Sequence, residues 1–330
     1  MHVVALAGGI GAGKFLRGVI RCVAPTDVTV IVNVADDVAI HGLHVSPDPD
    51  SVTYWLGDVF DRERGWGRRD ESFRATEELQ AFGAEDAWFG LGDLDLATHL
   101  YRTQLLRDGA PISEVMARVA DRFGVAARLL PATDDPVVTR VDCVDQTSGE
   151  PLDLHFQEYW VRRRAKDPVK GVRYEGAASA APAPGVLEAI GAADAVVFCP
   201  SNPVVSIGPI LAIPGIRQAV VERRDRAVGV SGIVGGGPVS GMADRLMPAA
   251  GIEVSAAGVA EHYRELLSAW LIDETDRAQA SRIGSAGLRV GVADTIMTDD
   301  DRAEAVARAT LGLLSSDDPV AGDDGEDGRA

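Results

Sequence analysis

The sequence predicts an α/β fold in which a mostly parallel sheet carries helices on both faces. Short apolar runs of strand length end in glycine-rich or polar turns, and the clearest are residues 3–7, 28–34, 194–199 and 227–234. Segments with helical spacing at 14–23, 186–190 and 216–222 lie between them. Strands that alternate with helices form parallel sheets with helices on both sides.

The middle of the chain differs from the two ends. Residues 51–122 have mainly helical patterns, and residues 127–160 contain alternating runs typical of antiparallel strands. We therefore expect a core of residues 1–50 and 170–312, with residues 51–169 forming a smaller inserted α+β or helical subdomain. Residues 313–330 are acidic and lack apolar periodicity, so we expect a disordered tail.

Composition excludes several classes of protein. The net charge of −18 repels nucleic acid and anionic membranes, so neither is an expected partner. The segment 162–170 is a basic island, which is either an anion pocket or, more commonly, a solvated loop. Cys22, Cys143 and Cys199 have neither zinc-site nor disulfide spacing, and no segment approaches the ~20 apolar residues of a membrane helix, so we expect a cytoplasmic protein.

The first strand is followed by a glycine-rich segment, Gly8 to Lys14, that fits GxxxxGK. Backbone N–H groups at Gly9 and Gly11 could cradle a phosphate, and Lys14 would add a positive charge. Phe15 replaces the hydroxyl residue that holds Mg²⁺ in ordinary P-loop NTPases, which argues against nucleotide hydrolysis. The alternative is that the glycines only form a tight turn between strand and helix.

Acidic residues follow the second strand. Asn33 precedes Asp36 and Asp37, and Asp48 and Asp50 come a little later. Carboxylates gathered beside a phosphate-binding loop suit Mg²⁺, so we expect a magnesium site, with Asp37, Asp48 and Asp50 as ligands. Taken singly, each aspartate is more often a helix cap or a turn residue.

Polar residues elsewhere could line the same site. On a predicted helix, His99 and Arg102 share one face, and Asp93 lies near its start. Two loops follow later strands, one with Ser201, Asn202 and Ser206 and one with Ser240 and Gly241. Loops at the carboxyl ends of parallel strands form ligand sites in such sheets. Capping and ordinary turns are the alternatives for each residue taken alone.

Ten short motifs, in order from about residue 3 to residue 275, are similar to those of the 2-phospho-L-lactate transferase family of coenzyme F420 biosynthesis. They are GGIGAGK, NVADD, SPDPDS, RGWG, GLGDLDLATH, LLPATDDP, HFQEYW, PSNPVVSIGPI, GPVSGMADRLMP and GVAEHY. The chain departs from the usual family pattern at Ile10, at Pro49 and Ser51 beside the two motif aspartates, and at Leu94, which replaces an arginine.

This resemblance implies a Rossmann-like core with a smaller added domain, a homodimer, and two small-molecule substrates. The implied reaction moves a phospho-acid from a guanosine diphosphate-linked donor to the ribityl 5'-hydroxyl of the deazaflavin Fo and releases GMP. The acid is lactate, enolpyruvate or glycerate, and the sequence leaves the choice open. The alternatives are a nucleotide-dependent kinase or NTPase and a nucleotide-sensing regulatory protein with a related phosphate-binding core.

The resemblance also suggests roles for the candidate residues. The glycine loop with Lys14, together with the Ser201–Asn202 and Ser240–Gly241 loops, would bind the guanosine diphosphate moiety. Either Asp50 or Asp37 would accept the proton of the attacking hydroxyl. One of Trp55, Trp66 and Trp88 could form an aromatic wall for the deazaflavin ring, although core packing is the commoner role of a tryptophan.

Overall fold

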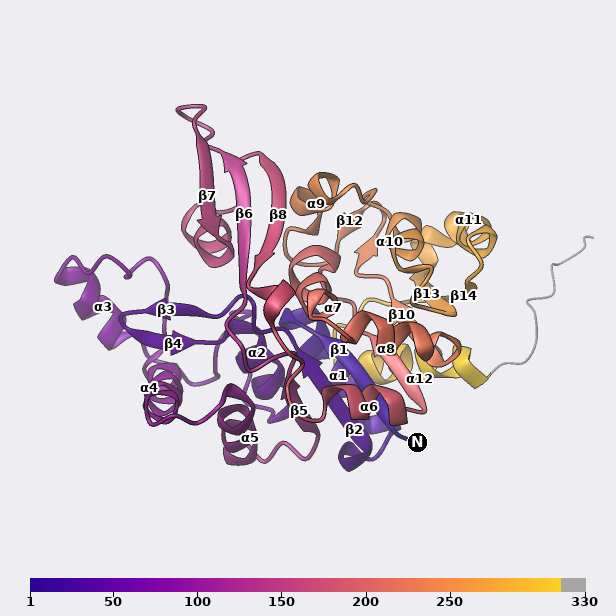
Figure 1. Cartoon of the computed structure of the whole chain (residues 1–330), viewed down its shortest axis with the longest axis horizontal. Helices are drawn as coiled ribbons and strands as arrows, with labels where there is room; N and C mark the ends of the chain where they lie inside the picture. The colour runs from indigo at the N-terminus through magenta and orange to yellow at the C-terminus, as the bar shows by residue number, and fades with distance from the viewer. Residues whose placement is uncertain (316–330) are drawn as a thin grey trace, which may run out of the picture.

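A seven-stranded parallel sheet forms the centre of the molecule in the computed structural model, which describes residues 1–315 (Figure 1). The strand order is β14-β13-β10-β9-β1-β2-β5, and every neighbouring pair is parallel. The strands span β1 (Val3–Ala7), β2 (Val28–Val32), β5 (Arg128–Pro131), β9 (Ala195–Phe198), β10 (Ala227–Val230), β13 (Ala269–Asp273) and β14 (Arg289–Ala293). The predicted α/β class is confirmed.

Helices cover both faces of this sheet because the central strands are apolar on both sides. Along β1, Val3, Ala5 and Ala7 pack in one core cluster, and Val4 and Leu6 pack in another. The first cluster includes residues of α1 (Gly9–Cys22), α2 (Pro47–Leu56), α5 (Ile112–Arg122) and α12 (Asp300–Ser315). The second includes residues of α6 (Val186–Ala192), α7 (Gly208–Ala212), α8 (Ile216–Glu222) and α10 (Ala256–Tyr263).

The order of the strands creates a switch point between β1 and β9. From β1 the chain continues to β2 and β5 on one side, and from β9 it continues to β10, β13 and β14 on the other side. The loops that leave β1 and β9 therefore diverge at the carboxyl edge of the sheet. Ligands of open α/β sheets bind in the crevice that such divergence opens.

Smaller sheets and helices extend from the core. Within the described residues β6 (Val138–Val144) pairs antiparallel with β7 (Pro151–His155) and β8 (Val169–Glu175), and this sheet projects at the top of Figure 1. The β3–β4 hairpin and α3 project at the left. The remaining elements are β3 (Val38–Ile40), β4 (Leu43–Val45), α3 (Arg74–Ala81), α4 (Asp93–Arg107), β11 (Ile233–Val234), β12 (Gly237–Pro238), α9 (Ala243–Leu246) and α11 (Ala280–Ser285).

Several elements differ from the expected bounds. The first helix begins at Gly9, so most of the predicted glycine loop is helical, and residues 227–234 form two strands. β5 lies inside the segment expected as an insertion but belongs to the main sheet, and β8, at the predicted boundary near residue 170, pairs with β6. The division into residues 1–50 with 170–312 and an insertion at 51–169 stays a prediction.

Only the first three residues of the predicted disordered tail belong to the described chain. Residues 313–315 complete α12, whereas the rest of the predicted disordered tail lies outside the described residues.

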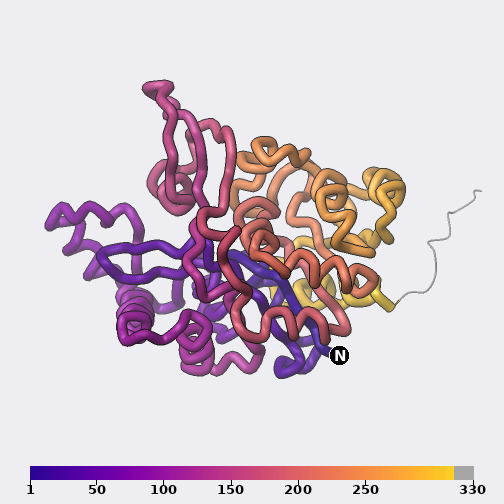
Figure 2. Tube along the Cα trace, viewed as in Figure 1, coloured from indigo at the N-terminus to yellow at the C-terminus, as the bar shows by residue number. Residues whose placement is uncertain are grey.

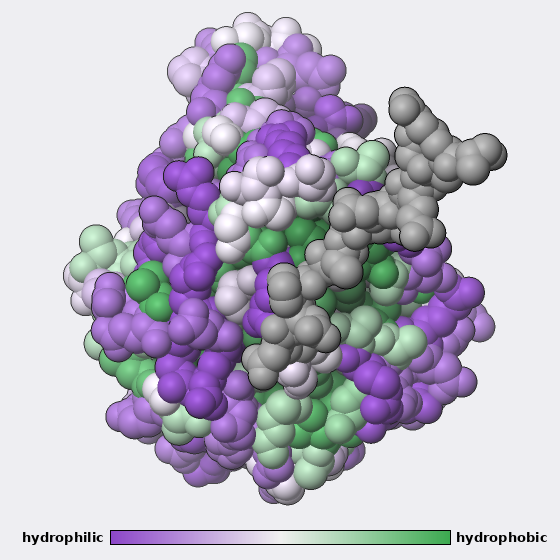
Figure 3. Space-filling model, turned by 90° about the vertical axis from the view of Figure 1, so that its right-hand side faces the viewer, coloured by the Kyte–Doolittle hydropathy of each residue, from purple (hydrophilic) through white to green (hydrophobic). Residues whose placement is uncertain are grey.

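Among residues 1–315 no single helix is long and apolar enough to cross a membrane, and one bent pair, Pro203–Ala212 with Ile216–Glu222, meets that test by length and composition alone. Figure 3 shows hydrophilic residues over much of one face, with apolar patches between them.

Helix α12, the last described helix, packs against helix α1 (Figure 2). Arg17 of α1 pairs with Asp300 at 2.8 Å, and Arg21 pairs with Asp301 at 2.7 Å. The two helices approach so closely at Gly18 that a Cβ atom there would lie 2.0 Å from the Ala303 carbonyl oxygen. Only glycine permits this packing, which holds the helix that follows β1.

Gly18→Ala is therefore expected to destabilise the protein, by about 1–3 kcal/mol, because the added methyl group has to push the two helix backbones apart. Urea unfolding followed by circular dichroism measures the loss. Gly191→Ala is the matched control, since Gly191 is exposed in α6 with nothing within 4 Å of its would-be Cβ. The control should be neutral or slightly stabilising. Equal stability of Gly18→Ala and wild type would contradict this packing.

Candidate active site

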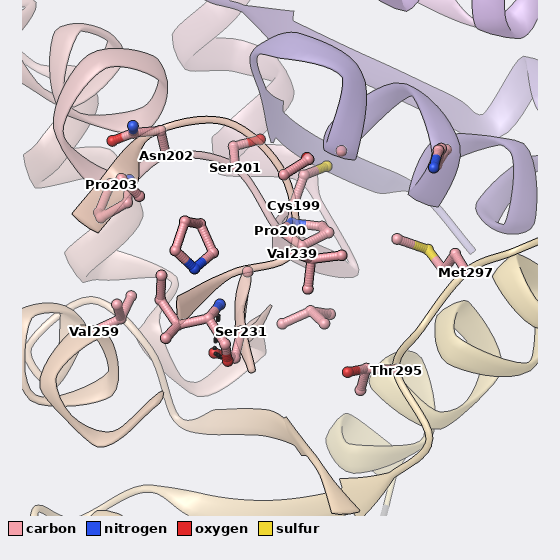
Figure 4. A pocket seen from close by; sticks show the side chains of 18 of the residues that line it. Cys199, Pro200, Ser201, Asn202, Pro203, Ser231, Val239, Val259, Thr295 and Met297 are labelled. Atoms are coloured by element: carbon pink, nitrogen blue, oxygen red, sulfur yellow. Dashed lines mark hydrogen bonds between the residues drawn. The ribbon is translucent and has the colours of Figure 1, made fainter. Parts of the chain in front are cut away.

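A cavity of about 210 Å³ opens at the carboxyl edge of the sheet, at the switch point (Figure 4). Most of its wall comes from segments that follow β1, β9, β10 and β14, and residues of α10 and β13 complete it. The lining residues are Gly11, Lys14, Cys199–Pro203, Val230–Ile233, Pro238–Ser240, Ala243, Val259, Tyr263, Trp270 and Thr295–Thr298. Figure 4 shows Ser201, Asn202 and Ser231 around this space, with Thr295 and Met297 on the opposite side.

Five of the predicted binding residues lie in this wall: Gly11, Lys14, Ser201, Asn202 and Ser240. Gly241 follows Ser240 directly and has a positive φ of 82°. Sequence reasoning missed Ser231–Ile233 and Thr295–Thr298. The first segment lies inside the apolar run 227–234, which was expected to be one strand, and the second follows β14, which was not predicted. Recognising the final strand would have pointed to Thr295–Thr298.

Glycine is required after β1 because neighbouring segments approach the backbone closely, and not because the chain forms a wide phosphate-binding loop here. A Cβ atom at Gly8 would lie 2.5 Å from Asp48 Oδ2, and one at Gly11 would lie 2.6 Å from the Pro200 carbonyl oxygen. At Gly13 it would lie 2.2 Å from Trp55 Cδ1. The glycine pattern therefore lets α1 pack against α2 and against the loop after β9.

Serine and asparagine residues after β9 secure this junction. The Ser201 hydroxyl donates to the Gly8 carbonyl oxygen at 2.9 Å, which ties the β9 loop to the end of β1. Ser206 also lies against Gly8, since a Cβ atom there would be 2.6 Å from Ser206 Cβ. The Asn202 Oδ1 accepts from the backbone N–H groups of Val204 and Val205 at 2.9 and 3.3 Å. These contacts hold the loop rigidly beside the cavity.

Asp36 and Asp48 form a buried acidic pair next to the Gly8–Gly9 turn. Both side chains are buried, and Asn33 donates to Asp48 Oδ2 at 2.9 Å. Burial raises the pKa of Asp48 to about 7, the Asp37 charge adds to this, and the hydrogen bonds from Asn33 and the Gly9 backbone oppose it. Burial and the Asp48 charge raise the pKa of Asp36 well above its usual range.

Asp37 lies beside this pair and is held from one side. Its Oδ2 contacts His44 Nε2 and accepts from the Ser46 hydroxyl, both at 2.7 Å, and His155 Nε2 lies 3.1 Å from its backbone carbonyl oxygen. Within residues 1–315, the buried Oδ1 atoms of Asp36 and Asp37 have no hydrogen-bond partner. A buried acceptor without a partner is costly, and a bound cation or donor group would relieve that cost.

Asp50 faces away from this cluster although it is only two residues from Asp48. Both of its carboxylate oxygens bind the guanidinium group of Arg102, with one N–O distance of 3.0 Å. Burial raises the pKa of Asp50 and the Arg102 charge opposes this, while the ion pair raises the pKa of Arg102. Because arginine stays protonated in proteins, it holds both carboxylate oxygens as an ion pair. His99 and Arg102 are each 1% exposed and do not line the cavity.

Other candidates have internal partners. Asp93 is bound by the Ser72 hydroxyl and the Ala75 backbone N–H, and so lies at the junction of α3 and α4. In the basic island, Arg163 pairs with Asp145 and Asp167.

The tryptophans fall into two groups. Trp55 is buried and stacks on Phe60 at 4.6 Å, and Trp88 packs in a small cluster with Leu91. Trp66 is 41% exposed. Core packing thus accounts for the first two.

A cavity at the switch point of a parallel sheet, with one lysine among its described lining residues, is typical of an α/β protein that binds a small molecule. The family model described as 2-phospho-L-lactate transferase CofD matches residues 3–309. The chain belongs to this family. It is therefore an enzyme, a transferase of coenzyme F420 biosynthesis, as its motifs predicted.

Similar proteins agree with this assignment. The chain is 50% identical over 314 residues to a Streptomyces griseus protein and 51% identical over 314 residues to one from Streptomyces avermitilis. It is 44% identical over 327 residues to one from Mycolicibacterium smegmatis. Each match covers 95% of this chain and 98% of the relative, and all three relatives are named phosphoenolpyruvate transferase.

Two solved structures of a Bacillus halodurans protein, which one of them describes as a member of the UPF0052 family, share the fold. Their TM-scores are 0.58 and 0.60, each at 19% identity. The first match covers 93% of this chain and 98% of the other, and the second covers 94% and 99%. At this identity the likeness supports the fold alone.

Asp48→Asn is expected to stabilise the metal-free protein more at pH 8 than at pH 5. A raised carboxyl pKa means that the folded state loses stability as the pH rises from the unfolded value of about 4 towards 7. Asparagine removes this ionisation, so the gain in unfolding free energy should be about 2 kcal/mol larger at pH 8. Denaturant unfolding at both pH values measures it. The same gain at both would show that Asp48 ionises normally.

Proposed function

We propose that this transferase moves a phosphoenolpyruvyl group from a guanosine diphosphate-linked donor to the ribityl 5'-hydroxyl of Fo and releases GMP. Family membership supports the transfer, and the three relatives named phosphoenolpyruvate transferase favour enolpyruvate over lactate. Family membership also disfavours the nucleotide-sensing alternative. A cytoplasmic homodimer remains part of this proposal as an expectation from the family resemblance, and sedimentation of the purified protein tests the dimer.

The cavity is the proposed site of the guanosine diphosphate moiety. Among its described lining residues, Lys14 is the only lysine or arginine. A phosphate bound here would gain a positive charge in a chain of net charge −18. Ser201, Asn202 and Ser240 supply polar groups, and Val239, Met297 and Trp270 supply apolar surface. A rigid wall with few polar groups is typical of small-ligand sites.

The buried acidic cluster fits a magnesium ion. Asp36 and Asp48 provide the hard oxygen ligands that Mg²⁺ prefers, and within the described chain the buried Oδ1 atom of Asp36 has no partner. Asp37, also expected as a ligand, is proposed as a proton acceptor instead. Within residues 1–315, no three side chains of His, Cys, Asp or Glu are gathered closely enough to hold a metal by themselves. One or two carboxylates would share the ion with donor phosphates, a common arrangement for Mg²⁺. Bound there, Mg²⁺ would neutralise phosphate charge.

This assignment modifies the metal site expected from the sequence. Asp48 keeps its predicted role, because it lies against the Gly8–Gly9 turn, and this is the observation that carries the proposal. Asp36 joins it, because the Asp48 charge raises the pKa of Asp36 and a shared cation would relieve this. Asp50 as a ligand would require breaking its pair with Arg102, so we propose that Asp50 is not a ligand.

The transfer exchanges one P–O bond for another. The Fo hydroxyl oxygen forms a bond to the phosphorus that carries the enolpyruvyl group, and the bond from this phosphorus to the bridging oxygen breaks. The bridging oxygen leaves with GMP. The hydroxyl proton passes to a carboxylate, and we propose Asp37, whose Oδ1 is free, as the acceptor. Positioning and charge neutralisation provide the rest of the rate.

Incubation of the protein with Fo, Mg²⁺ and each guanylylated acid tests the reaction directly. The enolpyruvyl donor should give a deazaflavin phosphodiester together with one GMP per product, seen by mass spectrometry. The lactyl product would be heavier by two hydrogen atoms, so the acids are resolved by mass. Faster turnover of the lactyl or glyceryl donor would overturn the choice of acid, and no product with any donor would overturn the proposed function.

Lys14→Met should lower kcat/KM for the donor by about 10- to 1,000-fold, because it removes the cation that faces the donor phosphates. Steady-state kinetics with varied donor measures the change. Lys170→Met is the matched control, since Lys170 is exposed on β8 and lies outside the cavity. It should behave as wild type. Equal kinetics for the two variants would remove Lys14 from the donor site.

A further inference from the structure

A buried chain of polar side chains lies behind the acidic cluster, between α2 and α4. Arg102 binds Asp50 through both oxygens, and its Nη1 lies 3.0 Å from His99 Nδ1. Because arginine can only donate, Nδ1 must accept, which leaves the ring proton of His99 on Nε2. That nitrogen lies 3.7 Å from Asp95 Oδ1, which accepts from the Tyr54 hydroxyl at 2.6 Å.

Arg102 also connects two segments that flank the acidic cluster. Besides Asp50 of α2, its Nη1 donates to the carbonyl oxygen of His44 in β4 at 3.4 Å. His44 in turn contacts Asp37. One buried side chain on α4 therefore contacts both the helix that carries Asp48 and the strand whose histidine holds Asp37.

The helix geometry explains how a contact at Asp50 acts on Asp48. Residues two apart on an α-helix are separated by about 200° around its axis, so the two carboxylates project from nearly opposite sides of α2. Asp48 packs against Gly8, and Asp50 packs against α4. The first turn of α2 is thus held between α1 and α4, and its position depends on both contacts.

We propose that Arg102 is a positioning residue for the transfer, which fixes α2 and β4 so that Asp48 and Asp37 keep their places beside the Gly8–Gly9 turn. The inference rests on the proposed function for the identity of the reaction. It assigns to Arg102 and His99 a role that does not require contact with substrate. A lysine would keep the charge but lose the planar fork that grips both Asp50 oxygens and the His44 carbonyl group.

Arg102→Lys tests this assignment. We expect kcat to fall by about 100-fold while KM for the donor stays at the wild-type value, because misplacement of catalytic groups slows the chemical step. We also expect faster hydrogen exchange in peptides that cover residues 43–56 of the metal-free protein. Arg107→Lys is the control, since Arg107 is on the same helix but is exposed and donates to the Gly42 carbonyl oxygen at 3.3 Å. It should match wild type in both measurements.

A second variant keeps the test decisive if Arg102→Lys folds poorly. Asp50→Asn preserves the shape of the side chain, and it should show the same split between kcat and KM. The double variant Asp50→Glu with Arg102→Lys should recover part of the lost kcat, because the longer acid can reach the ammonium group.

Wild-type kcat in Arg102→Lys, or a raised donor KM with unchanged kcat, would overturn the proposal. Inactive wild-type protein would instead refute the proposed function, and the exchange comparison would still test the positioning role.

Discussion

The proposed site depends on an energetically costly feature of the structure: Asp36 and Asp48 are buried beside each other at the ends of the first two strands. Burial removes the water that would solvate both carboxylates, and the Asp48 charge further raises the cost of ionising Asp36. One amide from Asn33 and the Gly9 backbone offset only part of this cost. A buried pair of carboxylates favours binding of a cation, and the nearby cavity has room for the phosphates that would share this cation.

Close packing brings the pair to the cavity. Glycines at positions 8, 11 and 13 remove the side chains that would separate α1 from α2 and from the loop after β9. Gly18 brings α12 against the same helix, and residues just before α12 line the cavity. Contacts made by glycine therefore join the acidic cluster, the β9 loop and the C-terminal wall into one site.

Much of the fold was predictable because buried parallel strands are continuous apolar runs. Residues 3–7 and 194–199 stand out for this reason, and the segments that follow them supply Lys14, Ser201 and Asn202. The sequence did not predict that β5 belongs to the main sheet. This strand is short and lies in a region with the pattern of alternating strands, so periodicity alone could not assign it. The helical form of the glycine segment was also hidden, since glycine is typical of loops.

The candidate site was less predictable because its chemistry depends on which way side chains face. Asp48 and Asp50 are equivalent in sequence, yet one lies in the acidic cluster and the other is neutralised by Arg102. The spacing of His99 and Arg102 correctly placed them on one helix face, but only packing shows that this face is buried against α2.

Titration of Mg²⁺ into the protein in the presence of GDP, followed by calorimetry at pH 7.5, tests the central claim most directly. The account predicts binding to the wild type that is lost in Asp36→Asn and Asp48→Asn and retained in Asp93→Asn, whose carboxylate lies at the α3–α4 junction. Unchanged Mg²⁺ affinity in both Asp36→Asn and Asp48→Asn would contradict it.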